Sequence, residues 1–211
     1  MQYFFKIQLG EKLIHARAFT FGEFQKLVAA KETGKLSEVV IEIIHECTGI
    51  NALELEKCEA EYIFLLLWCH SLNKMKIDAT WVCGVCNKEK VYSLDVSRTQ
   101  IPEVEPYILD LGQIKIKFRQ PKFTEDVDIM QMVIACIEYI VIGDQQFNID
   151  DLNAQDFDRV LDMLTTDKVE EVIDELTRNQ ITLAVPIKCE CGESGVYSLS
   201  GLSSFLKFFE V

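Results

Sequence analysis

Four cysteines, arranged in two short motifs, are the residues of this 211-residue chain best suited to chemistry. Cys83 and Cys86 form a C-x-x-C motif, and Cys189 and Cys191 form a tighter C-x-C motif. After each pair, four residues lead into the same sequence, Val-Tyr-Ser-Leu, at 91–94 and at 196–199. The chain therefore contains an internal repeat in which a thiol pair precedes a predicted β-strand.

Each copy of the repeat predicts a β-hairpin with the thiol pair at its tip. β-Branched and aromatic residues precede both pairs, at 77–82 and at 181–187, and turn-forming residues fill the connections. Two such tips brought together offer four thiolates, which is a ligand set typical of structural zinc. We therefore expect one structural Zn²⁺, bound by Cys83, Cys86, Cys189 and Cys191, that joins the two ends of the intervening segment.

Two alternatives to zinc remain open for these cysteines. Cys83 and Cys86 could form a thiol redox module, although a reactive C-x-x-C motif usually opens a helix in a βαβ unit. The C-x-C spacing departs from the usual two-residue knuckle, so the sequence leaves open whether both of its thiols bind the metal. The other four cysteines lie in apolar, helical segments, where we expect buried packing: Cys47, Cys58, Cys69 and Cys136.

Composition and charge narrow the class of protein. The start of the chain lacks the features of a signal peptide, and the longest apolar run, 62–69, is too short to span a bilayer. We therefore expect a soluble protein in a reducing cytoplasm, where thiol pairs bind metals more often than they form disulfides. No basic face or catalytic motif is visible, so the sequence predicts neither nucleic-acid binding nor enzymatic activity.

The net charge of −13 is concentrated in one segment. Residues 124–175 contain fifteen acidic residues against only Arg159 and Lys168. Apolar residues at helical spacing alternate with these acids, which predicts helices with an apolar face toward the core and an acidic face outward. The acidic face either serves solubility alone or binds a basic partner, and we take four residues as the candidate contact: Asp158, Asp162, Glu171 and Asp174.

Periodicity predicts an α+β fold, with a helical core, several β-hairpins and the two cysteine knuckles joined in a zinc-ribbon-like site. We expect one domain over residues 1–211. Its expected parts are an N-terminal hairpin and helices (1–72), the first knuckle hairpin and a second hairpin (73–123), an acidic helical segment (124–180), and the second knuckle hairpin with an apolar tail (181–211). Within the acidic segment we expect helices at 127–141, 154–164 and 167–178.

The order of these elements resembles the baseplate hub subunit and hub assembly family of T-even-like contractile-tail phages. The resemblance begins at the N-terminal hairpin, the helix around 21–27 and the helix that ends in Cys47-Thr48. It continues through the aromatic-rich segment 61–67, the segment 133–140 with Phe147 beyond it, and the end at 199–206. It thus spans nearly the whole chain, and it includes no catalytic motif.

The resemblance implies a viral morphogenesis protein that binds other baseplate hub and tail proteins. Such a protein acts either as an assembly factor or chaperone in the host cytoplasm, or as a hub subunit in the virion tail baseplate. Charge and hydropathy already predict no membrane and no nucleic-acid partner, and the sequence leaves the oligomeric state unknown. A small zinc-ribbon adaptor remains the alternative class, beside the redox module.

Overall fold

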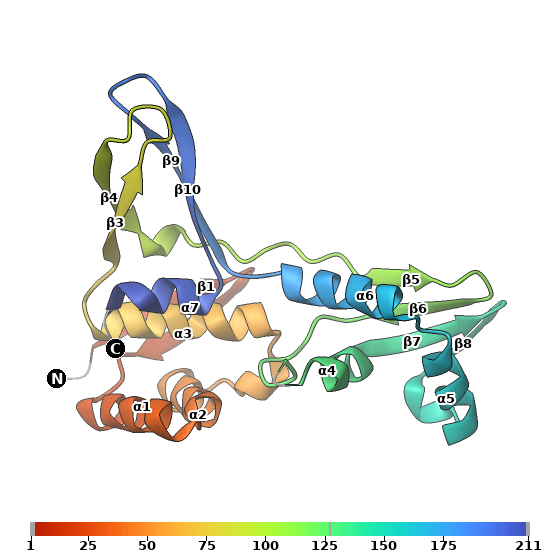
Figure 1. Ribbon diagram of the computed structural model, residues 1–211. Helices are drawn as coiled ribbons and strands as arrows, with labels where there is room; N and C mark the ends of the chain where they lie inside the picture. Colours follow the sequence, from red (N-terminus) through yellow and green to blue (C-terminus); the bar gives the residue numbers. More distant parts are fainter. Residues whose placement is uncertain (1–2, 127, 210–211) are drawn as a thin grey trace. The chain divides into compact units, whose positions relative to one another are not determined.

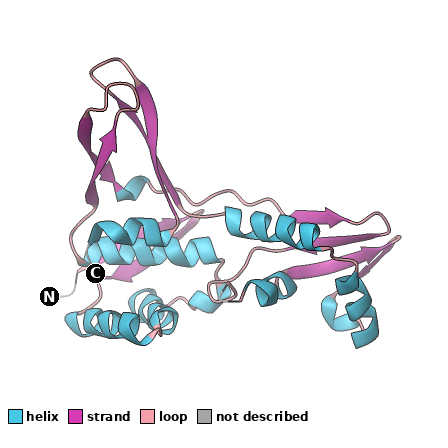
Figure 2. Cartoon of the chain, viewed as in Figure 1, coloured by secondary structure: helices cyan, strands magenta, loops and turns pink. Residues whose placement is uncertain are grey.

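The computed structural model describes residues 3–126 and 128–209, which contain seven α-helices and ten β-strands. The fold is α+β, as the sequence predicts, with small antiparallel sheets rather than one large sheet (Figure 2). Two compact units are present. The first comprises Met1–Pro102 and Gln180–Val211, and the second, Glu103–Asn179, is an insertion within the first. The single domain expected from the chain length remains a prediction for unfolding experiments.

The first unit begins with the expected hairpin of β1 (Phe4–Leu9) and β2 (Lys12–Arg17). Helix α1 (Phe21–Thr33) starts with a capping box between Thr20 and Glu23 and ends at Gly34, which adopts a left-handed φ of 72°. Helices α2 (Leu36–Thr48) and α3 (Lys57–Ser71) follow. Helix α3 is buried on nearly every side, so it forms the centre of this unit.

Two further hairpins and a short helix complete the first unit. Strands β3 (Lys76–Val82) and β4 (Glu89–Asp95) form one hairpin, and β9 (Thr182–Lys188) and β10 (Ser194–Ser200) form the other. The two hairpins lie side by side, although about a hundred residues separate their tips in the sequence (Figure 1). Helix α7 (Leu202–Leu206) follows β10 and packs against α3.

The second unit contains a four-stranded antiparallel sheet in the order β5-β6-β7-β8. Its strands are β5 (Tyr107–Asp110), β6 (Ile114–Phe118), β7 (Ile137–Ile142) and β8 (Gln145–Phe147). Its helices are α4 (Ile129–Ala135), α5 (Ala154–Asp162) and α6 (Thr166–Arg178). Side chains from the sheet and all three helices form one apolar core: Leu109, Ile116, Phe118, Met132, Val133, Cys136, Ile137, Ile140, Val160, Val172 and Leu176.

One secondary-structure prediction is wrong. The helix expected over 127–141 is only the short α4, and β7 begins two residues after it ends; Val127 itself lies outside the described residues. Helical spacing of apolar residues continues through Ile137 and Ile140, but both are β-branched and pair with β6 in the sheet. The acidic segment 124–180 is therefore partly strand rather than wholly helical.

Candidate metal centre

The first knuckle is a tight turn directly after β3. The N–H of Cys83 donates to the carbonyl of Lys88 at 3.0 Å, and the N–H of Asn87 donates to the carbonyl of Cys83 at 2.9 Å. Asn87 takes a positive φ of 56°, which a short polar residue tolerates. This turn lets the chain reverse direction within a few residues and keeps both thiols, of Cys83 and Cys86, at the same tip.

The second knuckle is shorter because a glycine closes it. The N–H of Cys189 donates to the carbonyl of Glu193 at 2.7 Å, and the N–H of Gly192 donates to the carbonyl of Cys189 at 3.1 Å. Gly192 has a φ of 98°, which residues with a Cβ rarely adopt. The glycine thus permits a turn with only one residue between the two cysteines.

The structure brings the four predicted cysteines together. All four Sγ atoms lie within 4.8 Å of one another. The Sγ atoms of Cys83 and Cys191 are 3.7 Å apart, and those of Cys86 and Cys189 are 3.5 Å apart, so each of these contacts joins the two hairpins. Zinc–sulfur bonds of about 2.3 Å in a tetrahedron place neighbouring sulfurs about 3.8 Å apart. The two measured distances fit that arrangement.

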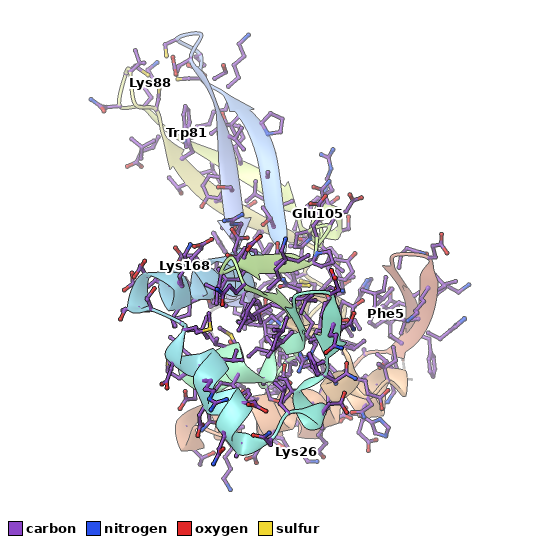
Figure 3. All side chains as sticks on the ribbon, turned by 90° about the vertical axis from the view of Figure 1, so that its right-hand side faces the viewer. Phe5, Lys26, Trp81, Lys88, Glu105 and Lys168 are labelled. Carbon is purple, nitrogen blue, oxygen red and sulfur yellow. The ribbon has the colours of Figure 1, made fainter. Side chains whose placement is uncertain are left out.

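Side chains between the hairpins position the two tips. The hydroxyl of Tyr92 donates to the backbone carbonyl of Lys188 at 2.7 Å, one residue before Cys189. Trp81, labelled with Lys88 in Figure 3, packs edge-on against the Tyr92 ring. On β10, a Cβ added to Gly195 would lie 3.8 Å from Trp81. The sequence analysis did not predict these contacts. The tyrosine that both copies of the repeat contain could have indicated them.

Two of the clustered thiols, one in each knuckle, have pKa values shifted in opposite directions. A backbone hydrogen bond from Cys86 lowers the pKa of Cys83 to about 7. A backbone hydrogen bond from Glu193 lowers the pKa of Cys191, but contacts with the neighbouring thiols outweigh it and raise that pKa to about 12. Thiolates this close together repel one another when no cation is bound. A divalent metal ion suits such a cluster, because it replaces the protons and neutralises the thiolates.

The other four cysteines are buried and scattered, as predicted. Burial raises the pKa of Cys47 and Cys58 to about 11 and that of Cys69 and Cys136 to about 12. Thiols in such surroundings stay protonated and act as small apolar side chains.

The four acidic candidates lie on the helices of the second unit, and all are exposed. Asp158 and Asp162 are on α5, and Asp174 is on α6. Glu171 differs from these three, because its carboxylate accepts a hydrogen bond from Tyr107 at 2.7 Å and forms an ion pair with Lys168 at 2.7 Å. Glu171 therefore has a structural role on its own unit.

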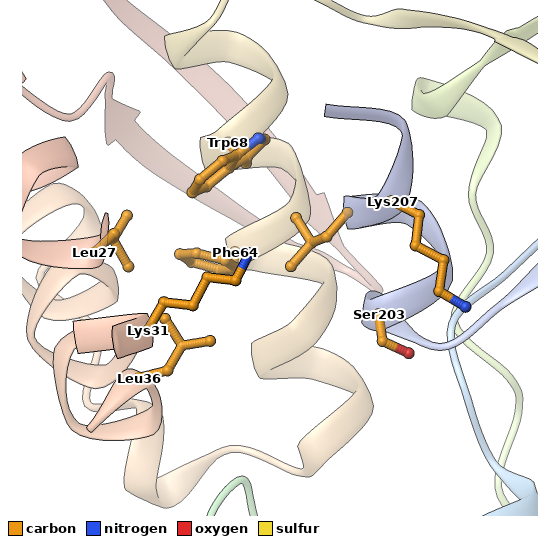
Figure 4. Close-up of a pocket in the computed structure, with 8 residues that line it drawn as sticks. Leu27, Lys31, Leu36, Phe64, Trp68, Ser203 and Lys207 are labelled. Atoms are coloured by element: carbon orange, nitrogen blue, oxygen red, sulfur yellow. The ribbon is translucent and has the colours of Figure 1, made fainter. Parts of the chain in front are cut away.

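The first unit also contains an apolar pocket of about 260 Å³ that the sequence did not reveal. Helices α1, α3 and α7 contribute most of its walls (Figure 4). Its lining is Leu27, Lys31, Leu36, Phe64, Trp68, Ser203, Leu206 and Lys207. The lining holds no cluster of metal-binding or nucleophilic side chains, so it suggests no reaction.

The fold and site define a protein with no recognised catalytic constellation among its described residues and with a compact four-thiol centre. Over residues 1–207 the chain matches a family described as T4 bacteriophage base plate protein. It is also 35% identical, over 207 residues, to the baseplate hub assembly protein gp26 of Enterobacteria phage T4, and the match covers 98% of each chain. The chain therefore belongs to the T4 bacteriophage base plate protein family, which confirms the resemblance seen in its sequence.

No solved structure matches the chain significantly. None of the helices in the described part of the chain is long and apolar enough to cross a membrane.

Proposed function

We propose that this protein acts in the assembly of a phage baseplate hub by binding other hub and tail proteins, without catalysing a reaction. The observation that carries the proposal is the 35% identity, across 98% of both chains, with a protein named for baseplate hub assembly. Such a match leaves no large segment of either chain unaccounted for. The protein works in the host cytoplasm and leaves the complex or remains in the tail baseplate once the hub is complete.

Genetic complementation tests this role. A phage that lacks the gene should produce no complete hubs, and the protein supplied from a plasmid should restore them. Quantification of the protein in purified tails then separates an assembly factor, which is depleted there, from a hub subunit, which is retained in stoichiometric amount. Normal hub formation without the protein would contradict the proposal.

The cysteine cluster is proposed as a structural zinc site. Four sulfurs within 4.8 Å of one another, with two pairs at 3.7 and 3.5 Å, would occupy all four positions of a tetrahedral zinc ion, and closed sites of this kind stabilise folds. Zinc would bind residues of the first unit that lie before and after the inserted second unit in the sequence, and it would hold the two hairpins together. We expect about one zinc per chain by native mass spectrometry with elemental analysis. A folded, metal-free protein with eight titratable thiols would contradict this assignment.

Reactivity distinguishes zinc from the redox alternative. A redox module would use Cys83 and Cys86 as its reversible disulfide, whereas each sulfur contact given above pairs one of these residues with a cysteine of the other hairpin. Bound zinc should protect all four thiols from alkylation until a chelator removes it. Rapid alkylation of Cys83 alone, with zinc still bound, would favour the redox module.

The exposed acidic face of α5 and α6 is proposed as a contact for a basic hub component. Residues 103–179 contain eighteen acidic and seven basic residues, so the second unit carries −11 of the net charge of −13. Such a field accelerates encounter with a cationic surface, and salt screens it.

Charge reversal tests this contact. Asp158→Lys, Asp162→Lys and Asp174→Lys together should slow capture of the hub partner and reduce its dependence on salt. Glu171 is left unchanged because Tyr107 depends on it. Reversal of Glu38, Glu54 and Glu89, three exposed acids of the first unit, is the matched control. Equal capture by all three proteins would assign the acidic face to solubility alone.

A further inference from the structure

β10 is an edge strand with an open side. Its two-stranded sheet has the order β10-β9, so the ladder bonds of β10 run to β9 alone. Its outward side chains are exposed: Ser194, Val196, Ser198 and Ser200. An edge strand of this kind presents backbone N–H and C=O groups that can pair with another strand.

The usual protections of an edge strand are missing from β10. Natural proteins block sheet edges with charged side chains, proline, bulges or very short strands. Among the described edge strands, β1, β2, β3, β4 and β5 each contain charged residues, β9 contains Pro186 and Lys188, and β8 has only three residues. β10 has seven residues, Ser-Gly-Val-Tyr-Ser-Leu-Ser, with neither charge nor proline.

The internal repeat makes the contrast specific. β4 and β10 share the sequence Val-Tyr-Ser-Leu, and the residues beside it differ. In β4 these residues include Glu89, Lys90 and Asp95, whereas in β10 they are serine and glycine. One copy of the repeat therefore has a charged edge and the other has a neutral edge.

Symmetry identifies the partner that a neutral edge favours. When a strand pairs with its own copy about a two-fold axis, each residue faces a residue of the same strand, so like charges can meet. A pair of β4 strands centred on Tyr92 would place Glu89 opposite Asp95. A pair of β10 strands centred on Tyr197 would place serine opposite serine at both ends and no charge opposite any other.

We propose that two copies of this protein associate through antiparallel pairing of their β10 strands, which creates a four-stranded sheet of order β9-β10-β10-β9. A sheet of four strands is more stable than an isolated hairpin, which gives the association its driving force. The two chains each carry a net charge of −13 and repel each other, so added salt strengthens this dimer. That salt dependence is opposite to the one expected for the acidic face with a basic partner.

Sedimentation equilibrium of the full-length, zinc-loaded protein tests the proposal. The wild-type chain should show a reversible monomer–dimer equilibrium that shifts toward dimer as salt is added. Val196→Lys places a cation on the exposed face of β10 in both copies and should raise the dimer dissociation constant about tenfold. Val91→Lys is the matched control, because it makes the same change at the equivalent position of β4 and should leave the dimer intact; the wild-type side chains are 65% and 62% exposed.

Hydrogen exchange supplies a second measurement. Amide protons in 196–198 should become more protected as protein concentration rises, while those in 91–93 should not change. Circular dichroism and zinc content should be the same in both variants. A chain that stays monomeric at every concentration and salt, or a dimer that Val196→Lys and Val91→Lys weaken equally, would overturn the proposal.

Discussion

The paired hairpins of the first unit and the four-stranded sheet of the second unit bury very different amounts of apolar side chain. Near the base of the hairpins Ile77, Leu94 and Leu199 are buried, but toward the tips the buried residues are mainly Ile187, Cys83 and Cys189. The sheet of the second unit instead packs on a continuous core that includes Phe118, which is fully buried. Zinc thus would act where apolar burial is scarce, as it does in many small folds.

Loss of the metal should have the largest effect, and it should fall on the hairpins. Structural zinc is worth about 10–16 kcal/mol in finger peptides, compared with about 5–15 kcal/mol for the stability of a whole domain. Cys189→Ser should therefore release zinc, lower the melting temperature and disorder both hairpins. In a Trp68→Phe background, Trp81 fluorescence reports directly on the hairpins.

Cys136→Ala is the control for this prediction, because Cys136 lies in the core of the second unit and is not one of the four clustered cysteines. It should lower stability moderately and leave zinc bound. Equal loss of hairpin order in both variants would argue against the proposed ligand set.

A substitution in the core of the second unit should have the opposite distribution of effects, with the second unit destabilised and the hairpins unchanged. Phe118→Ala removes a fully buried ring and should cost about 3–5 kcal/mol of unfolding free energy. Hydrogen exchange should show the loss in β5, β6 and β7, while zinc content and Trp81 fluorescence stay at wild-type values. Simultaneous loosening of the hairpins would instead show that the two units unfold as the single domain expected from the sequence.

Each unit contains an Arg–Glu ion pair of similar geometry. These two ion pairs test whether the stability of the two units depends on pH in the same way. Arg17 forms two hydrogen bonds with Glu23, at 2.6 and 2.9 Å, and Arg119 forms two with Glu125, at 2.8 and 2.9 Å. The hydrogen bond from Arg17 lowers the pKa of Glu23 from 4.5 to about 2. Arg119 lowers the pKa of Glu125 in the same way.

Because both pKa values are lowered on folding, each ion pair stabilises the fold fully above pH 4.5, and that stabilisation is lost as the pH falls through the lowered pKa, which is about 2 for Glu23. Glu23→Gln and Glu125→Gln should each cost about 1 kcal/mol at neutral pH and flatten the acid limb of stability. Urea unfolding between pH 2 and 7 measures both slopes. A variant that keeps the wild-type slope would show that its ion pair does not contribute.

The smallest expected effect is an increase in the stability of the hairpins. Gly195 lies inside β10, and a Cβ at this position would make ordinary contacts of 3.8 Å with Trp81 and Ile187. Gly195→Ala should stabilise the hairpins by about 0.5–1 kcal/mol, because glycine within a strand costs more backbone entropy than alanine. Thermal unfolding measures the change, and a destabilised variant would show that the hairpins pack more tightly than these distances indicate.

The sequence predicted the cysteine cluster better than it predicted the second unit. Ligand chemistry is local, so two thiol pairs, each leading into the same strand, were enough to predict that Cys83, Cys86, Cys189 and Cys191 meet. Caps such as Thr20 and Gly34 likewise fixed helix ends through local hydrogen bonds. Strand β7 was missed because its partner, β6, is about twenty residues away, and no local signal records that pairing.

The division into two units was also not visible in the sequence. It depends on contacts between residues far apart in the chain, such as the backbone hydrogen bonds that join Gln100 and Thr182 at the base of the insertion. The acidic face proposed as a contact is also hard to delimit from sequence. Acidic residues that bind within their own unit, such as Glu171, cannot be distinguished in sequence from acidic residues that are available to a partner.

X-ray absorption spectroscopy at the zinc edge tests most directly whether a metal holds the hairpins together. For the purified wild-type protein, four sulfur ligands at about 2.3 Å are expected, and replacement of any one of the four cysteines by serine should remove that shell or the metal itself. A folded wild-type protein that binds no zinc, or a zinc ion with mainly nitrogen and oxygen ligands, would contradict the assignment of Cys83, Cys86, Cys189 and Cys191.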